Sequence, residues 1–362
     1  YIIGIVLNYV ILDLSFLNGS IATLLAISCF FLFLVVTLPT GMLMNKIGRK
    51  KTVLLSFALQ AIALCIPVIA YDFIFIMIAF AFIGIGNTLL QVSLNPLVTD
   101  VVSKEKLTGT LTLGQFVKAV CSFLGPIITT WPAGMAFGWK LIFPIYAGTS
   151  LIAFIWLWLT PMKESERGET ISLRGTLRLF KDKYIVAFFI GILVLVGVDV
   201  GMNTTFPKLL MEKCGLQLHE AGLGNSVYFF ARTLGALGGG IFLLKYPEIK
   251  FFKYSVFFAA AGLAGMLVTG SLWLLLVCVI IFGLGYANLF AIIFSLSLKR
   301  VPDKANEVSA LLIMGVSGGA ILTPVLGLTS DFFGTQFAAL ALIAIVWLYM
   351  VWLITWVNKT EV

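Results

Sequence analysis

The stretch that decides the fold reads Gly84-Ile85-Gly86-Asn87-Thr88-Leu89-Leu90-Gln91-Val92-Ser93-Leu94-Asn95-Pro96, within an apolar segment from Phe73 to Val98. Asn87, Gln91 and Asn95 are four residues apart, so on a helix they share one face. Amides on a membrane helix are costly unless they meet polar partners or a wet cavity. The proline can kink the helix, and the glycines allow a neighbouring helix to come close. The stretch therefore indicates either a polar seam between helices or the wall of a solute pathway.

Composition places the whole chain in a membrane. Hydrophobic residues make up 60% of its 362 residues and charged residues 11%, a balance that excludes a soluble globular domain. The five cysteines show no metal-ligand spacing, and the single histidine excludes a histidine-rich metal site. We therefore expect a polytopic helical membrane protein with no metal and no cofactor.

The apolar segments predict an all-α fold with twelve transmembrane helices. They are expected at 1–12, 20–44, 52–70, 73–98, 107–131, 141–159, 185–210, 221–244, 251–270, 272–298, 308–329 and 337–357. A spanning helix needs about 20 residues. The first segment is shorter, so we expect that helix to be truncated at its front.

One polar linker divides the helices into two sets of six. The predicted domains are an N-terminal half at 1–160, a linker at 161–184 and a C-terminal half at 185–362. Shifting the sequence by 199 residues places Gly41 on Gly240 and Gly84 on Gly283, in matching helices. The halves therefore look like pseudo-repeats, a known transporter plan with the solute site at the midplane between halves.

Lys and Arg residues predict the orientation. Nineteen lie in one set of loops and three in the other, and the remaining two of the 24 lie inside apolar segments. The positive-inside rule then places the linker and the C-terminus in the cytoplasm. We expect a multi-pass protein of the plasma membrane, the bacterial inner membrane. Because the positive charge reflects topology, we expect no nucleic-acid partner.

A basic loop follows the second apolar segment. The sequence Gly41-Met42-Leu43-Met44-Asn45-Lys46-Ile47-Gly48-Arg49-Lys50-Lys51 resembles the loop signature G-x-L-x-D-R-x-G-R-R of the major facilitator superfamily. Asn45 stands where that family usually has Asp. The resemblance implies a gating loop built from Gly41, Asn45, Gly48, Arg49 and Lys50. A plain positively charged loop is the alternative interpretation.

The opening stretch resembles one branch of that superfamily. Gln91-Val92-Ser93-Leu94-Asn95-Pro96 is similar to the E-T-A-A-N-P or Q-V-A-A-N-P of the fucose/glucose–galactose sugar:proton symporters, and Leu113-Gly114-Gln115 also resembles that branch. This resemblance implies a sugar as solute and a proton as coupling ion. In the fucose members an acidic residue at the position of Gln91 takes part in coupling. Its absence here favours the hexose side of the branch.

Three ionisable side chains other than Cys and Tyr lie deep in apolar segments, namely Lys118, Asp199 and Arg232. Buried charges should face the protein interior. Asp199 is the candidate proton carrier, with Arg232 as its partner; a purely structural ion pair is the alternative. Amides both donate and accept hydrogen bonds, which suits a polyhydroxyl solute. The predicted solute-binding residues are Asn87, Gln91, Asn95, Gln115, Lys118, Asn203, Asn225, Tyr228 and Asn288.

Together these features predict a monomeric secondary active transporter, a symporter that moves a small polar solute across the bilayer by alternating access. A hexose coupled to a proton is the expected pair. One alternative is a major facilitator permease for a non-sugar organic solute or for drug efflux. A membrane-embedded enzyme is the rival from another class. It would need a nucleophile–base pair or a metal site, and the lone histidine and lone deep carboxylate supply neither.

Overall fold

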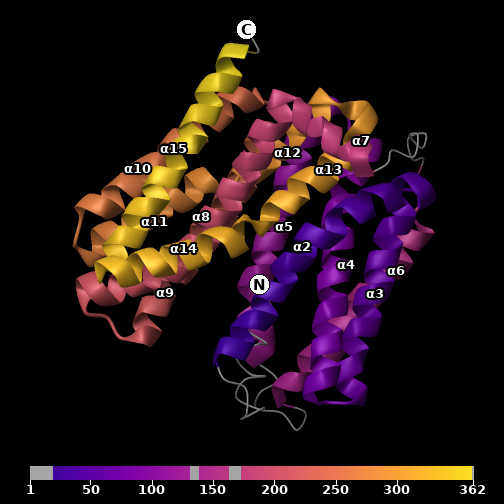
Figure 1. The fold of residues 1–362 in the computed structure, drawn as a ribbon, viewed down its shortest axis with the longest axis horizontal. Coiled ribbons are helices and arrows are strands. Elements are labelled where there is room, and N and C mark those ends of the chain that lie inside the picture. The colour runs from indigo at the N-terminus through magenta and orange to yellow at the C-terminus, as the bar shows by residue number, and fades with distance from the viewer. Residues whose placement is uncertain (1–18, 131–137, 163–172, 361–362) are drawn as a thin grey trace. The chain divides into compact units, whose positions relative to one another are not determined.

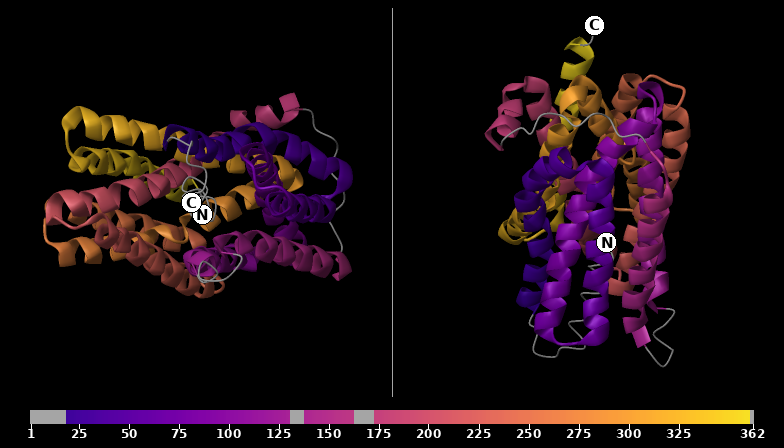
Figure 2. Two further views of the ribbon diagram at one scale, coloured as in Figure 1. Left: turned by 90° about the horizontal axis from the view of Figure 1, so that it is seen from below. Right: turned by 90° about the vertical axis from the view of Figure 1, so that its right-hand side faces the viewer.

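The computed structural model describes residues 19–130, 138–162 and 173–360. Every regular element in these ranges is a helix, as Figure 1 and the two further views of Figure 2 show. Nine helical stretches of the described residues are long and apolar enough to cross a membrane. The shorter stretch Leu34–Ile47 is apolar as well.

The helices of the first half begin and end close to the predicted segments. They are α2 (Gly19–Ile47), α3 (Arg49–Ile69), α4 (Phe73–Val101), α5 (Lys104–Thr130), the short 3₁₀ helix η2 (Gly138–Leu141) and α6 (Ile142–Leu159). The predicted segment 1–12 lies outside the described residues. The linker contributes α7 (Leu173–Leu177) and η3 (Arg178–Lys181).

The second half contains α8 (Lys183–Cys214), α9 (Leu218–Leu243), α10 (Glu248–Val268), α11 (Leu272–Tyr286), α12 (Leu289–Arg300), η4 (Pro302–Lys304), α13 (Ala305–Met314), η5 (Gly315–Ser317), α14 (Gly318–Phe333) and α15 (Gln336–Thr360). Two predicted helices are therefore interrupted. The segment 272–298 breaks after Tyr286, and the segment 308–329 breaks at Gly315–Ser317. Glycine disfavours a continuous helix. At Gly318 it also allows close approach, because a Cβ there would clash with the carbonyl of Leu193 on α8.

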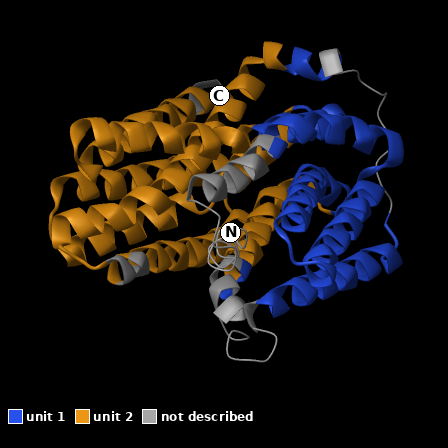
Figure 3. Cartoon of the chain, turned by 60° about the horizontal axis from the view of Figure 1, so that its bottom comes forward, with its two compact units in different colours: residues 1–101, 121–179, 301–314 blue, residues 102–120, 180–300, 315–362 orange. Residues whose placement is uncertain are grey.

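The contacts divide the chain into two compact units (Figure 3). Unit 1 comprises residues 1–101, 121–179 and 301–314, and unit 2 comprises residues 102–120, 180–300 and 315–362. In unit 1, α3 packs against α4 and α6. In unit 2, α8 packs against α9, α14 and α15, and α10 packs against α11. The start of α5 thus groups with the second half, and α13 groups with the first. The domain boundaries at 160 and 185 stay a prediction.

The predicted repeat is visible in how glycines pack. A Cβ on Gly86 of α4 would lie 3.3 Å from the carbonyl oxygen of Ser56 on α3. A Cβ on Gly285 of α11 would lie 2.7 Å from the carbonyl oxygen of Ser255 on α10. Both glycines and both serines are related by the shift of 199 residues. The small residues of the opening stretch therefore permit close helix packing, as the sequence predicts.

We expect Gly285→Val to lower the free energy of unfolding by about 1–3 kcal/mol, because the new side chain would meet the backbone of α10. Gly327→Val is the matched control, since a Cβ at Gly327 meets nothing within 4 Å. Thermal unfolding of both variants in detergent measures the difference. Equal midpoints for the two variants would contradict this packing.

Candidate functional site

The amide stripe lies on α4, in unit 1. Asn87, Gln91 and Asn95 are each half-buried, and the helix continues through Pro96, so they remain on one face. Asn95 Nδ2 donates a hydrogen bond to the Gln91 carbonyl, at 3.3 Å. Pro96 cannot donate to the carbonyl of residue 92, four positions earlier. The Ser309 hydroxyl takes over this bond, at 2.6 Å, and joins α13 to α4.

An ion pair lies inside unit 2. Asp199 on α8 is 5% exposed, and its Oδ1 accepts a hydrogen bond from Arg232 Nη1 at 2.6 Å. The same oxygen accepts a second bond from the Tyr228 hydroxyl at 2.7 Å. Tyr228 and Arg232 are four residues apart on α9, so both can reach one carboxylate. The predicted pairing of Asp199 with Arg232 is present.

The pair extends to α11 through an aromatic side chain. The Arg232 guanidinium lies over the ring of Tyr286, 4.8 Å from its centroid. The Tyr286 hydroxyl donates to the Leu195 carbonyl of α8 at 3.0 Å. Three helices are therefore joined around one buried charge pair. Lys118, on the part of α5 that belongs to unit 2, lies close enough to Asp199 and Arg232 to interact with both charges.

Two amides continue this network along α8 and α9. Asn203 Nδ2 donates to the Asp199 carbonyl at 2.8 Å, and Asn225 Nδ2 donates to the Asn203 carbonyl at 2.9 Å. Both amide oxygens are buried, and neither has a hydrogen-bond partner among the described residues. A buried acceptor without a partner costs about 1–3 kcal/mol. These two oxygens are suited to accept hydrogen bonds from a hydroxylated ligand. We call Asp199, Asn203, Asn225, Tyr228 and Arg232 the Asp199 network.

Two further predicted solute-binding residues lie in unit 2, Gln115 and Asn288. Gln115 is half-buried on α5. Asn288 is 2% exposed between α11 and α12 and donates to the Gly235 carbonyl of α9 at 3.1 Å. It lines a groove formed with α10, and its amide oxygen is also buried without a hydrogen-bond partner among the described residues.

The predicted gating loop forms a polar cluster with α13 in unit 1. Arg49 Nη1 pairs with Asp100 at 2.5 Å, and Arg49 Nε donates to Asn306 at 2.8 Å. Asn45 donates to Glu307 at 2.5 Å and accepts from Asn306 at 2.6 Å. These five residues form the Arg49 cluster. The loop thus contacts Asn306 and Glu307 of α13, and its gating role stays a proposal.

The cluster explains the unusual residue at position 45. Glu307 is 4% exposed, and an Asp at position 45 would place two carboxylates against each other. Asn instead donates to the carboxylate. Two other predicted gating residues have structural roles. Gly48 has a positive φ of 96°, a conformation that favours glycine. Lys50 Nζ donates to the carbonyl of Thr160 at the end of α6, at 2.8 Å. A Cβ on Gly41 would lie 3.0 Å from Cβ of Ala310 on α13.

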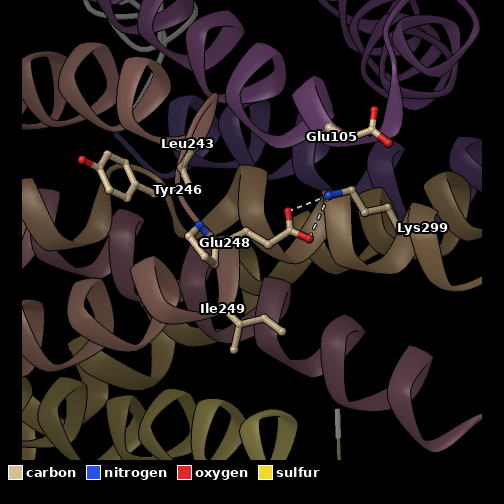
Figure 4. Close-up of a pocket in the computed structure, with 7 residues that line it drawn as sticks. Glu105, Leu243, Tyr246, Glu248, Ile249 and Lys299 are labelled. Atoms are coloured by element: carbon tan, nitrogen blue, oxygen red, sulfur yellow. Dashed lines mark hydrogen bonds and ion pairs between the residues drawn. The ribbon is translucent and has the colours of Figure 1, made fainter. Parts of the chain in front are cut away.

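A second cluster lies in unit 2, around a hollow of about 310 Å³ (Figure 4). Glu248, the first residue of α10, pairs with Lys299 near the end of α12 at 2.8 Å. The hydroxyl of Thr108, on α5, donates to Glu248 and contacts the Ser295 hydroxyl at 2.6 Å. Thr108, Glu248, Ser295 and Lys299 form the Glu248 cluster.

The two clusters are repeat mates with exchanged charges. The shift of 199 residues relates Arg49 to Glu248, Asp100 to Lys299 and Thr108 to Glu307. In each cluster, an ion pair at the ends of two helices holds the start of a helix from the other sequence half. Sequence reasoning missed Asp100, Glu248, Lys299 and Glu307, because it used Lys299 only as a sign of topology and assigned no role to the three acids. The same shift, applied to charged residues as well as glycines, would have found the two pairs.

Comparison with known proteins identifies the family. The sequence profile of the Major Facilitator Superfamily matches residues 1–208 and 189–362. The chain belongs to the Major Facilitator Superfamily. It is accordingly a multi-pass membrane transporter of small molecules rather than an enzyme, and the predicted all-α fold of this family is confirmed.

Similar proteins carry several solutes. A glucose/galactose transporter of Brucella abortus is 26% identical over 332 residues, which cover 86% of this chain and 80% of the relative. A nitrite extrusion protein of Bacillus subtilis is 25% identical over 275 residues, covering 75% of this chain and 67% of the relative. The structure of the E. coli fucose:proton symporter FucP has a TM-score of 0.85 at 17% identity and covers 98% of this chain and 95% of that one.

Exchanging the charges of Glu248 and Lys299 tests whether the Glu248 cluster requires only that the two charges be opposite. We expect Glu248→Lys alone to slow solute exchange in proteoliposomes roughly tenfold, a loss of about 1.4 kcal/mol, because two lysines would then face each other. Glu248→Lys combined with Lys299→Glu should restore most of the rate. The hydroxyls of Thr108 and Ser295 can donate or accept, and so can serve either arrangement. A double variant as slow as the single one would show that more than charge pairing is needed.

Proposed function

We propose that the chain is a proton-coupled symporter for a hexose or a related sugar. The observation that carries this proposal is the pair of buried amide oxygens, on Asn203 and Asn225, beside a buried carboxylate. Sugar hydroxyls are donors that would satisfy these acceptors. The glucose/galactose relative supports the choice of solute, and the fucose:proton neighbour supports the choice of ion.

The proposed orientation has the linker and the C-terminus in the cytoplasm of a bacterial cell, with the protein in the inner membrane. The distribution of Lys and Arg supports it. The Arg49 and Glu248 clusters then lie on the cytoplasmic side. There, each holds the start of one helix within the unit formed mainly by the other sequence half.

Counterflow in proteoliposomes tests the choice of solute. Vesicles loaded with unlabelled D-glucose, D-galactose or L-fucose should take up the labelled form of a hexose that the protein carries. The nitrite relative provides a rival, because a small anion could pair with the cations Lys118 and Arg232. Inhibition of hexose counterflow by nitrite, or exchange of nitrite with no hexose exchange, would favour this rival.

Removing an amide of the network should weaken sugar binding. We expect Asn203→Ala to cost about 1–3 kcal/mol of binding free energy, because a sugar hydroxyl would lose its acceptor. Gln91→Ala on the α4 stripe should cost a similar amount. Equilibrium binding of the labelled sugar measures both. Thr204→Val is the control, since Thr204 is exposed and bonds only within its own helix. Unchanged affinity in both amide variants would remove them from the sugar site.

Coupling should depend on the carboxyl group of Asp199. We expect Asp199→Asn to abolish uphill accumulation while exchange continues, because an amide cannot carry the proton. The variant leaves Arg232 buried without its partner, which costs about 3–5 kcal/mol. Asp199→Asn with Arg232→Gln removes both charges and keeps the test valid if the single variant fails to fold.

Tyr228→Phe is the matched control for coupling, since it removes a hydrogen bond to Asp199 but keeps the carboxyl group. It should still couple sugar uptake to proton movement, whatever its affinity for the sugar, because the carboxyl group is kept. If the Asp199 variants accumulate sugar uphill with an unchanged pH profile, Asp199 is not the proton carrier and the pair has a structural role only.

A further inference from the structure

Unit 2 contains a second hollow that the proposed transport mechanism does not use. It is an open groove of about 630 Å³ along α9, α10 and the α11–α12 junction. The lining is almost entirely apolar. The residues that shape it are Gly238 and Phe242 of α9, Phe251 and Tyr254 of α10, and Asn288 at the α11–α12 junction.

The groove has a smooth floor and aromatic walls. Gly238 lies in its floor, and a Cβ there would meet nothing within 4 Å, so the space above the backbone is open. Phe242 on α9 is 54% exposed and Tyr254 on α10 is 73% exposed. A flexible hydrocarbon chain can lie along this open apolar floor, between the exposed aromatic rings. A second helix is the other occupant that a glycine-rich face admits, and the oligomeric state of the Gly238 variant below distinguishes the two.

The length of the groove matches one leaflet of a bilayer. On α9 it runs from Phe242 to Leu234, and on α10 from Phe251 to Ala261. At 1.5 Å per residue these distances are about 12 and 15 Å. The hydrocarbon core is about 30 Å thick, so one leaflet spans roughly 15 Å. Asn288, whose amide is buried, lines the groove from the α11–α12 junction. Of the lining residues, it is the one most distant in sequence from the α9–α10 loop.

Three lysines gather at the α9–α10 loop, where the groove begins. Lys245, Lys250 and Lys253 are all exposed. The acid between them, Glu248, is already paired with Lys299. Lys245 is three residues from Phe242, and Lys250 and Lys253 stand on either side of Phe251, so positive charge flanks this end of the groove.

We propose that this groove binds an anionic phospholipid, with its phosphate on the three lysines and an acyl chain along Gly238. Basic residues beside an apolar cleft are the chemistry that retains anionic lipids at a membrane surface. The proposal does not depend on which solute the protein carries.

Native mass spectrometry of the full chain in detergent tests the site with two lipids of identical acyl chains, phosphatidylglycerol and phosphatidylcholine. The wild type should retain one phosphatidylglycerol with roughly 100-fold preference, from three lysines near the phosphate. Replacing Lys245, Lys250 and Lys253 together by Gln should remove the preference. Gly238→Leu should prevent retention of either lipid by filling the floor.

Two controls match these variants. Gly327→Leu places the same side chain at another open position. Replacing Lys104, Lys106 and Lys304 by Gln removes the same charge from other exposed lysines. Both should retain phosphatidylglycerol as the wild type does. Equal retention of the two lipids by the wild type, or unchanged retention in Gly238→Leu, would overturn the proposal. So would a wild-type dimer that Gly238→Leu dissociates, because the groove would then be a self-association face.

Discussion

The ion pair between Asp199 and Arg232 is the interaction on which the interior of unit 2 depends. A charge placed in a bilayer is costly, and removing one partner of a buried pair costs about 3–5 kcal/mol. The pair therefore determines what surrounds it. Tyr228 bonds the same carboxylate oxygen, and Tyr286 covers the guanidinium and bonds the backbone of α8. Any movement of α8, α9 or α11 must keep these charges compensated. Protonation of the Asp199 carboxylate would change that balance, so it can be linked to movement of these helices.

Charges at the ends of the helices must also be compensated, and here the two sequence halves use opposite arrangements of charge. Each sequence half has one ion pair at equivalent positions, but the acid and the base are exchanged between Arg49–Asp100 and Glu248–Lys299. Both pairs join a positive and a negative side chain, but each position has the opposite charge in the other half. The third partner also follows the repeat, since Thr108 and Glu307 occupy equivalent positions. Asn45 is explained in the same way, because its amide is compatible with the carboxylate beside it where an acid would not be.

Much of the fold could be predicted from hydrophobic segments, because a bilayer requires long apolar helices. The close packing at Gly86 and Gly285 followed from residue size. The breaks after Tyr286 and at Gly315 did not, since hydropathy shows only that both segments are apolar and long enough to span. At the site, the Asp199–Arg232 pair could be predicted because deep charges are few. Asn288 shows the limit, because an amide near a glycine pair gives no sign of whether it faces a pathway or the groove beside α10.

The most direct test of proton-coupled sugar transport is the movement of protons that sugar itself causes. In de-energised proteoliposomes that contain a pH-sensitive dye, D-glucose or D-galactose added outside should acidify the lumen. Vesicles with Asp199→Asn should show no such signal, while sugar exchange continues. Sugar uptake by the wild type without any change of lumenal pH would contradict the account, as would acidification of equal size in the Asp199 variant.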